Sequence, residues 1–164
     1  MRAMRNGFAV AMLGLWVTLF AGCEGTTTGT EIAKVPLQAA DGGGYAPAKF
    51  TLATGMNPVS INFRADFSQN PDDFGKWNTY RVALSKDGSV VASRNININH
   101  PQTRRPQGDT NDAPPPTGTV HPLFVTDVQA SGDYELTITA LQPPAITLSN
   151  PTVDVRRNVA RGPQ

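Results

Sequence analysis

The chain has 164 residues, of which 39% are hydrophobic and 16% charged, so it is long enough for one ordinary domain and short for two. Its formal net charge of +1 excludes the strongly basic face that nucleic-acid binding requires. Glycine (15 residues) and proline (14 residues) are frequent, which favours short strands and turns over long helices.

Residues 1–22 have the three parts of an export signal. Arg2 and Arg5 make the start basic, the 15-residue apolar run GFAVAMLGLWVTLFA follows, and small residues precede a polar chain. A transmembrane helix usually needs about 20 apolar residues. The run therefore predicts a helical signal peptide, with an uncleaved membrane anchor as the alternative. Without Arg2 and Arg5, 12 basic side chains remain against 13 acidic ones.

Cys23 is the only cysteine of the chain. A disulfide would need a second cysteine, and a thiolate metal site would need further ligands. The segment Phe20-Ala21-Gly22-Cys23 resembles the lipobox of bacterial lipoprotein signal peptides, with Phe20 where that family usually has leucine. The resemblance implies that Cys23 receives a diacylglyceryl group, that the chain is cut before it, and that the new amine is acylated. Two or more acyl chains hold a protein firmly on a bilayer.

The residues after the lipobox predict where the protein resides. In Gram-negative lipoproteins, aspartate after the cysteine commonly marks retention in the inner membrane, so Glu24 favours the outer membrane. Residues 24–31 are small and polar, and we expect 23–33 to form the lipidated cysteine and a flexible tether. The resemblance thus implies a domain that faces the periplasm and meets the membrane through acyl chains on Cys23.

The mature chain alternates with period two, as half-buried antiparallel strands do. The pattern predicts strands at 60–67, 79–85, 89–98, 133–141 and 152–156, and shorter ones at 35–39 and 49–53. Asp87-Gly88 predicts a tight hairpin turn, and imperfect alternation around Arg94 predicts a bulge. Seven or eight strands over 34–158 predict an all-β antiparallel sandwich, followed by the tail 159–164.

Residues 123–138, LFVTDVQASGDYELTI, resemble the E strand, corner and F strand of immunoglobulin-like domains. Gly132 and Tyr134 match the corner glycine and tyrosine, whereas Ala130 stands where an aspartate is usual. The resemblance implies an immunoglobulin-like β-sandwich in which the Tyr134 ring packs inward and its hydroxyl bonds to nearby backbone. It places Trp77 roughly where a core tryptophan would lie, and it carries no activity with it.

The proline-rich segment 99–122 is predicted to be a long loop, and loops of this length are usually functional or disordered. We expect it to be mobile. His100 and His121 bracket it, with Asp109 and Asp112 between them. Each histidine precedes a proline, and nothing fixes its second nitrogen as a metal ligand requires. We therefore interpret both histidines as solvated loop residues rather than metal ligands.

Three aromatic residues, Tyr45, Trp77 and Tyr80, are candidates for stacking against a sugar. Core packing explains Tyr80 and Trp77 first because they fall on a predicted strand. Tyr45, in the segment DGGGYAPA, is the more exposed candidate. Together with His100 and His121, Tyr45 and Trp77 are the candidate ligand contacts.

No motif in the chain indicates catalysis. Asp66, Asp72 and Asp73 lack the regular order of a calcium loop and predict a solvated turn. A nucleophile elbow and a phosphate-binding loop are absent from the sequence, so we expect no enzyme and no cofactor. The sequence favours a lipid-anchored envelope lipoprotein that acts as a structural or binding accessory domain. Its expected partner is an envelope protein that the sequence does not identify. The alternative is an enzyme or solute-binding lipoprotein with its site in the 99–122 loop.

Overall fold

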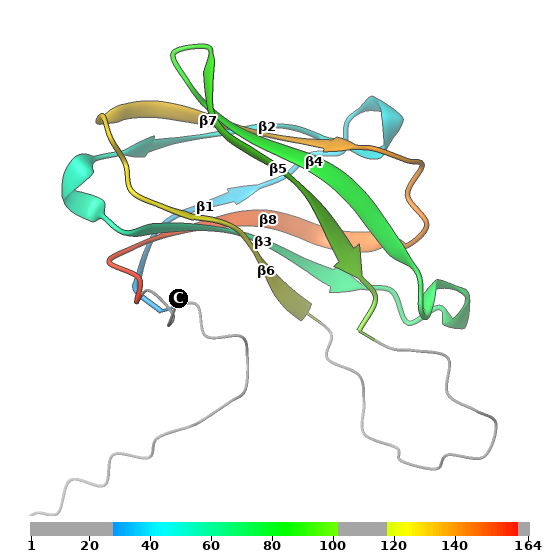
Figure 1. Ribbon diagram of the computed structural model, residues 1–164. Helices are drawn as coiled ribbons and strands as arrows, with labels where there is room; N and C mark the ends of the chain where they lie inside the picture. The colour runs from blue at the N-terminus through cyan, green and yellow to red at the C-terminus, as the bar shows by residue number, and fades with distance from the viewer. Residues whose placement is uncertain (1–27, 102–117, 161–164) are drawn as a thin grey trace, which may run out of the picture.

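The computed structural model describes residues 28–101 and 118–160. The expected signal peptide, Cys23 and the middle of the 99–122 segment lie outside these residues. Eight strands form two antiparallel sheets that pack face to face (Figure 1). The strands are β1 (Thr30–Pro36), β2 (Tyr45–Leu52), β3 (Val59–Phe67), β4 (Trp77–Lys86), β5 (Ser89–Asn99), β6 (Gly118–Thr126), β7 (Gly132–Ala140) and β8 (Leu148–Arg157). Three short 3-10 helices lie in the connections: η1 (Asp41–Gly43), η2 (Thr54–Met56) and η3 (Pro71–Asp73).

The strand order is β1-β8-β3-β6 in one sheet and β2-β7-β4-β5 in the other. The predicted all-β antiparallel sandwich is therefore confirmed. Apart from the β4–β5 hairpin, every connection crosses from one sheet to the other. This is the connectivity of an eight-stranded jelly roll, which contains two Greek keys.

The immunoglobulin resemblance extends through the middle of the chain. Among themselves, strands β3 to β7 pair in the same way as strands B, C, C′, E and F of an immunoglobulin domain. In that domain strand A lies beside B and strand G beside F. Here β8 lies beside β3 and β2 lies beside β7, so the outer strands are exchanged between the sheets.

The corner between β6 and β7 has the geometry that the resemblance implies. Tyr134 is buried, and its hydroxyl donates to the carbonyl oxygen of Ala130 at 2.6 Å. Gly132 has a φ of +143°, and a Cβ there would lie 3.2 Å from Cε of Lys86. The corner thus needs glycine at one position and a tyrosine hydroxyl two residues later.

The β4–β5 hairpin confirms the turn and moves the bulge. Asp87 (φ 49°) and Gly88 (φ 77°) both have positive φ, as tight hairpin turns require. The register shifts between Leu84 and Ser85, whose partners are Ala92 and Val90. The extra residue of the bulge therefore lies before Ala92 and not around Arg94.

Three predicted boundaries are corrected. Strand β1 begins at Thr30, so pairing with β8 takes up the last residues of the expected tether 23–33. Strand β6 begins at Gly118, so the expected 99–122 loop is shorter. Its Pro122 is compatible with a strand because β6 is an edge strand. Val159, at the start of the expected tail, is buried, and its N–H donates to the carbonyl oxygen of Pro58 at 3.2 Å. It therefore belongs to the folded domain.

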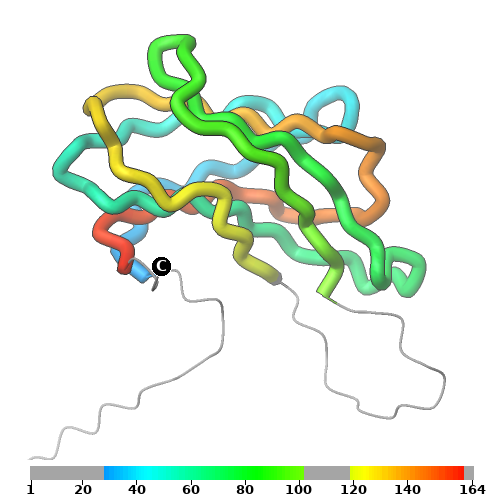
Figure 2. Tube along the Cα trace, in the orientation of Figure 1, coloured from blue at the N-terminus to red at the C-terminus, as the bar shows by residue number. Residues whose placement is uncertain are grey.

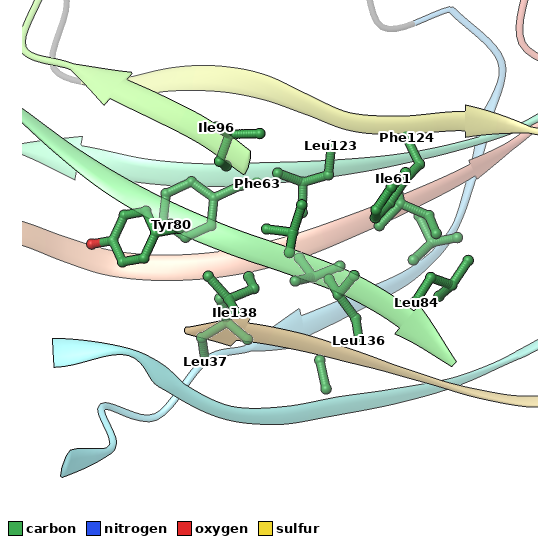
Figure 3. Packing of buried hydrophobic residues seen from close by; sticks show 14 of the residues in the cluster. Leu37, Ile61, Phe63, Tyr80, Leu84, Ile96, Leu123, Phe124, Leu136 and Ile138 are labelled. Carbon is green, nitrogen blue, oxygen red and sulfur yellow. The ribbon is translucent and has the colours of Figure 1, made fainter. Parts of the chain in front are cut away.

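The core lies between the two sheets (Figure 3). Alternate residues of β3, β4 and β7 point inward, as the period-two pattern predicted. The largest fully buried side chains are Tyr80, Phe63, Leu52, Ile61, Leu84, Ile98, Leu123 and Leu136. Burying them away from water supplies the main favourable term for folding.

The sandwich has two ends, each formed by a set of loops (Figure 2). The N-terminal end contains the start of β1 and the connections 53–58, 87–88 and 127–131. The far end contains the connections 37–44, 68–76 and 141–147. Figure 1 shows the N-terminal end at the left and the far end at the right.

Candidate functional site

The four residues predicted as ligand contacts all lie in the far half of the sandwich. Tyr45 begins β2, Trp77 begins β4, and His100 directly follows β5. His121 lies on β6, where it is paired with Phe63. These strands begin or end at the far end, but of the four residues only Tyr45 lines the pocket found there.

A pocket of about 480 Å³ opens at the far end. Its walls are residues of the β1–β2 connection, the segment 144–151, and Tyr45, Asn78 and Tyr80 from β2 and β4. None of the residues that line it carries a formal charge. Its volume falls within the range of small-molecule sites, and its walls suit an uncharged ligand.

Two tyrosines form the aromatic wall of this pocket. The ring centroids of Tyr45 and Tyr80 are 5.9 Å apart, and both rings pack near Phe63, at 5.8 Å and 6.5 Å. Burial, and then the neighbouring Tyr80, raise the pKa of the Tyr45 phenol above its ordinary value. The phenol therefore stays neutral and can both donate and accept a hydrogen bond.

Asn78 fixes the opposite wall. Its Oδ1 accepts from the N–H groups of Ala145 (2.7 Å) and Ile146 (3.0 Å). Its Nδ2 donates to the carbonyl oxygen of Ile146 and to the Tyr80 hydroxyl, both at 3.0 Å. One buried amide thus holds segment 144–151 against the aromatic wall. Sequence reasoning predicted the inward Tyr80 but missed Asn78, because the predicted strand began at residue 79 and only the register of β4 shows that Asn78 and Tyr80 face the same way.

Both histidines are packed, so the interpretation of solvated loop residues is wrong. His100 is 5% exposed, its Nε2 lies 2.9 Å from the carbonyl oxygen of Ser68, and its ring packs against Phe67 and Phe74. The Nε2 of His121 lies 2.8 Å from Oγ1 of Thr119. Burial lowers the pKa of His121.

The two histidines contact the same phenylalanine ring. The Phe67 ring contacts both, with centroid distances of 5.2 Å to His100 and 6.4 Å to His121. Within residues 28–101 and 118–160, no three His, Cys, Asp or Glu side chains are grouped so that they could hold a metal ion.

The acidic turn before β4 is partly structural, which corrects the expected solvated turn. Asp73 is buried, and its Oδ2 accepts from the Ser68 hydroxyl and from the N–H of Thr147 at 3.1 Å. The Ser68 hydrogen bond is the largest of the effects that lower the pKa of Asp73. On β3, Asp66 accepts from Nδ2 of Asn150 at 2.9 Å. Both carboxylates therefore hold residues of the segment that walls the pocket.

Trp77 is not a core residue. Its side chain is 53% exposed, because the inward phase of β4 is set by Asn78, Tyr80, Val82 and Leu84. Trp77 lies in the other phase, on the outer face of the sheet β2-β7-β4-β5. The expectation from the immunoglobulin resemblance fails here by one residue of register.

A second cavity, of about 570 Å³, lies at the N-terminal end, beside the β4–β5 hairpin. Charged groups line it, and they are largely engaged with one another. Lys49 pairs with Glu135 at 3.7 Å, and the Thr51 hydroxyl donates to Asp133 at 2.7 Å. The Tyr45 pocket is the stronger candidate, since its polar groups are held in place by buried contacts.

Searches against protein-family models, curated proteins and solved structures find no match to this chain. Among the residues described by the structure, no helix is long and apolar enough to cross a membrane. The assignment of a function therefore depends on the sequence and on the geometry of the site.

Proposed function

We propose that the protein is a lipid-anchored lipoprotein of the cell envelope, held on the outer membrane through Cys23, that acts as a binding accessory facing the periplasm. The lipobox-like segment before Cys23 supports the anchor. Strand β1 begins at Thr30, seven residues after Cys23. The tether is therefore short, and the N-terminal end of the sandwich is the end held near the bilayer.

The observation that carries the binding role is the position of the neutral pocket. It opens at the far end of the sandwich, where β1 ends and Leu37 lines the pocket. A ligand in this pocket would approach from the side away from the anchor. Such an arrangement suits a protein that presents a binding site to the envelope space.

The chemistry of the pocket favours an uncharged ligand. Tyr45 offers aromatic surface and a neutral hydroxyl, the buried Tyr80 packs beside it, and Asn78 keeps the facing segment in place. An ionic ligand would lose hydration there and meet no opposite charge, which is unfavourable. The alternative of an enzyme with its site in the 99–122 loop would use His100 and His121 as catalytic groups. Their Nε2 atoms are instead hydrogen-bonded to Ser68 and Thr119. Binding is thus favoured over catalysis.

The anchor is tested by Cys23→Ser. We expect wild-type protein to incorporate a palmitate analogue and to fractionate with membranes, and the variant to do neither. Trp77→Ala is a matched control that should label like the wild type. Equal labelling of Cys23→Ser and wild type would contradict the lipoprotein assignment.

The pocket is tested with a matched pair of variants. Ala145 lines the pocket, is exposed and contributes only its backbone to the Asn78 contact. Ala145→Trp should fill the opening, whereas Ala130→Trp places the same bulk at the N-terminal end. Fluorine NMR with neutral, anionic and cationic fragments should detect neutral binders that Ala145→Trp loses and Ala130→Trp keeps. The proposal would be contradicted if charged fragments bound as well as neutral ones, or if Ala145→Trp bound the neutral fragments as well as the wild type.

A further inference from the structure

The outer face of the sheet β2-β7-β4-β5 carries a row of amides beside the exposed tryptophan. Cross-strand pairs place Trp77 opposite Asn99, Thr79 opposite Asn97, and Arg81 opposite Asn95. All six residues belong to the outward phase of β4 and β5. We propose that this surface, called the Trp77 face, binds a neutral polysaccharide chain.

Trp77 supplies the apolar contact. More than half of its side chain is exposed, although burying a large aromatic ring is normally favourable. The C–H faces of a sugar ring are apolar and flat enough to cover an indole, while its hydroxyls point to the sides. An exposed indole on a rigid strand is thus prepared for stacking, with little ordering cost on binding.

The asparagines supply the polar contacts. Side chains on one face of a strand recur about every 6.8 Å, so Asn95, Asn97 and Asn99 form a row long enough for an oligosaccharide. Oδ1 of Asn97 accepts from the Thr79 hydroxyl at 3.0 Å, which orients the amide. Each amide can donate and accept, and sugar hydroxyls and acetamido groups require both.

The charge of the Trp77 face selects a neutral chain. Arg81 is the only formally charged residue among the six, so most of the face offers a polyanion no opposite charge. The acidic residues Asp133 and Glu135 lie nearer the N-terminal end of the same sheet. Among the residues that the structure describes, Leu141 is the other large apolar residue exposed near the far end, besides Trp77. This small apolar area favours a polyhydroxylated ligand over a protein interface.

The inference rests on the proposed role in binding but not on the Tyr45 pocket. Trp77, Asn95, Asn97 and Asn99 are not among the residues that line that pocket. Binding at the Trp77 face therefore survives if the pocket assignment fails, and the Ala145→Trp variant separates the two. The anchor is likewise separate, because Cys23→Ser leaves the Trp77 face unchanged.

Tryptophan fluorescence tests this surface directly. The chain has two tryptophans, and the other, Trp16, lies in the expected signal peptide. In full-length protein held in detergent micelles, with Trp16→Phe as a background, emission reports Trp77 alone. Chitohexaose or cellohexaose should shift the emission to shorter wavelength with saturation, and hexagalacturonate should not. Absence of a shift with both neutral hexasaccharides would overturn the inference, as would an equal shift with the anionic one.

Substitutions assign the binding to named side chains. By sedimentation with insoluble chitin and cellulose, Trp77→Ala should weaken binding at least about tenfold, as loss of a central aromatic anchor does. Trp77→Tyr should recover part of it, and Asn97→Ala should weaken it less. Val91→Ala, which lies outside both the Trp77 face and the Tyr45 pocket, should bind like the wild type. Full binding by Trp77→Ala would overturn the assignment even if the protein binds glycan elsewhere.

Discussion

Arg64 on β3 donates from both Nε and Nη2 to one carboxylate oxygen of Asp154 on β8, each at 3.1 Å. Arg156 donates from Nε to the same oxygen at 3.2 Å. Asp154 is fully buried, and its other oxygen, Oδ1, has no hydrogen-bond partner in the described part of the chain. The buried Asp154 carboxylate on β8 thus binds the Arg64 guanidinium of β3 and the Arg156 guanidinium of its own strand. Strands β3 and β8 are the two central strands of their sheet.

Removing this anion should destabilise the fold. Asp154→Ala leaves Arg64 and Arg156 facing each other without their shared partner, and we expect a loss of about 3 kcal/mol in the free energy of unfolding. Urea denaturation measures it. Glu135→Gln, which breaks the exposed pair with Lys49, should cost under about 1 kcal/mol. Equal costs for the two variants would show that the buried cluster is not structural.

The corner tyrosine gives a graded prediction. Tyr134→Phe removes only the hydroxyl that donates to Ala130 and should cost about 1 kcal/mol. Tyr134→Ala also removes a buried ring and should cost about 3 to 5 kcal/mol. Chemical denaturation of both variants separates the two contributions. A Phe variant as unstable as the Ala variant would contradict this division.

Two neighbouring glycines test the wall of the pocket. Gly42 and Gly43 both have positive φ, at +76° and +83°, so alanine is strained at either position. A Cβ at Gly43 would lie 2.5 Å from Pro144, whereas one at Gly42 meets nothing within 4 Å. Gly43→Ala should therefore cost more than Gly42→Ala, by about 1 kcal/mol or more. Thermal unfolding of both variants measures this difference in stability. Equal losses of stability would contradict the close contact between residue 43 and Pro144.

Stability should fall in mild acid because of His121. Burial lowers its folded-state pKa below the ordinary 6.5, so the unfolded chain binds this proton more tightly. The stabilisation is complete above about pH 6.5 and decreases as the pH falls from there towards the lower folded-state pKa. Urea unfolding between about pH 5 and 8 should show the decrease, and His121→Gln should flatten it. An unchanged slope in the variant would assign the effect to other groups.

The features that follow from short stretches of sequence were predictable. Alternation located β3, β4, β5 and β7 because each has one buried face. The Asp87-Gly88 turn and the Tyr134 corner depend on a few adjacent residues. Tyr45 was a candidate because glycines before it indicated an exposed connection, and the structure shows it half-buried against Phe63 and Tyr80.

The remaining features depend on contacts between distant segments. The immunoglobulin resemblance placed Trp77 in the core, but Trp77 lies outward because it is three residues before the inward Tyr80 and so has the opposite phase. The burial of His100 depends on Phe67, Phe74 and Ser68, which come from other elements. The exchange of β2 and β8 between sheets leaves no local signal, because the strands alternate in the same way in either position.

We propose that the protein is anchored at one end of the sandwich and binds its ligand at the other. Because Cys23 is the only cysteine and its thiol would be acylated, Ala130→Cys and Ala145→Cys each introduce one labelling site. With the lipidated protein on vesicles that contain an acceptor dye, energy transfer from residue 130, at the N-terminal end, should exceed transfer from residue 145, at the far end. Equal transfer, or stronger transfer from residue 145, would contradict the claim.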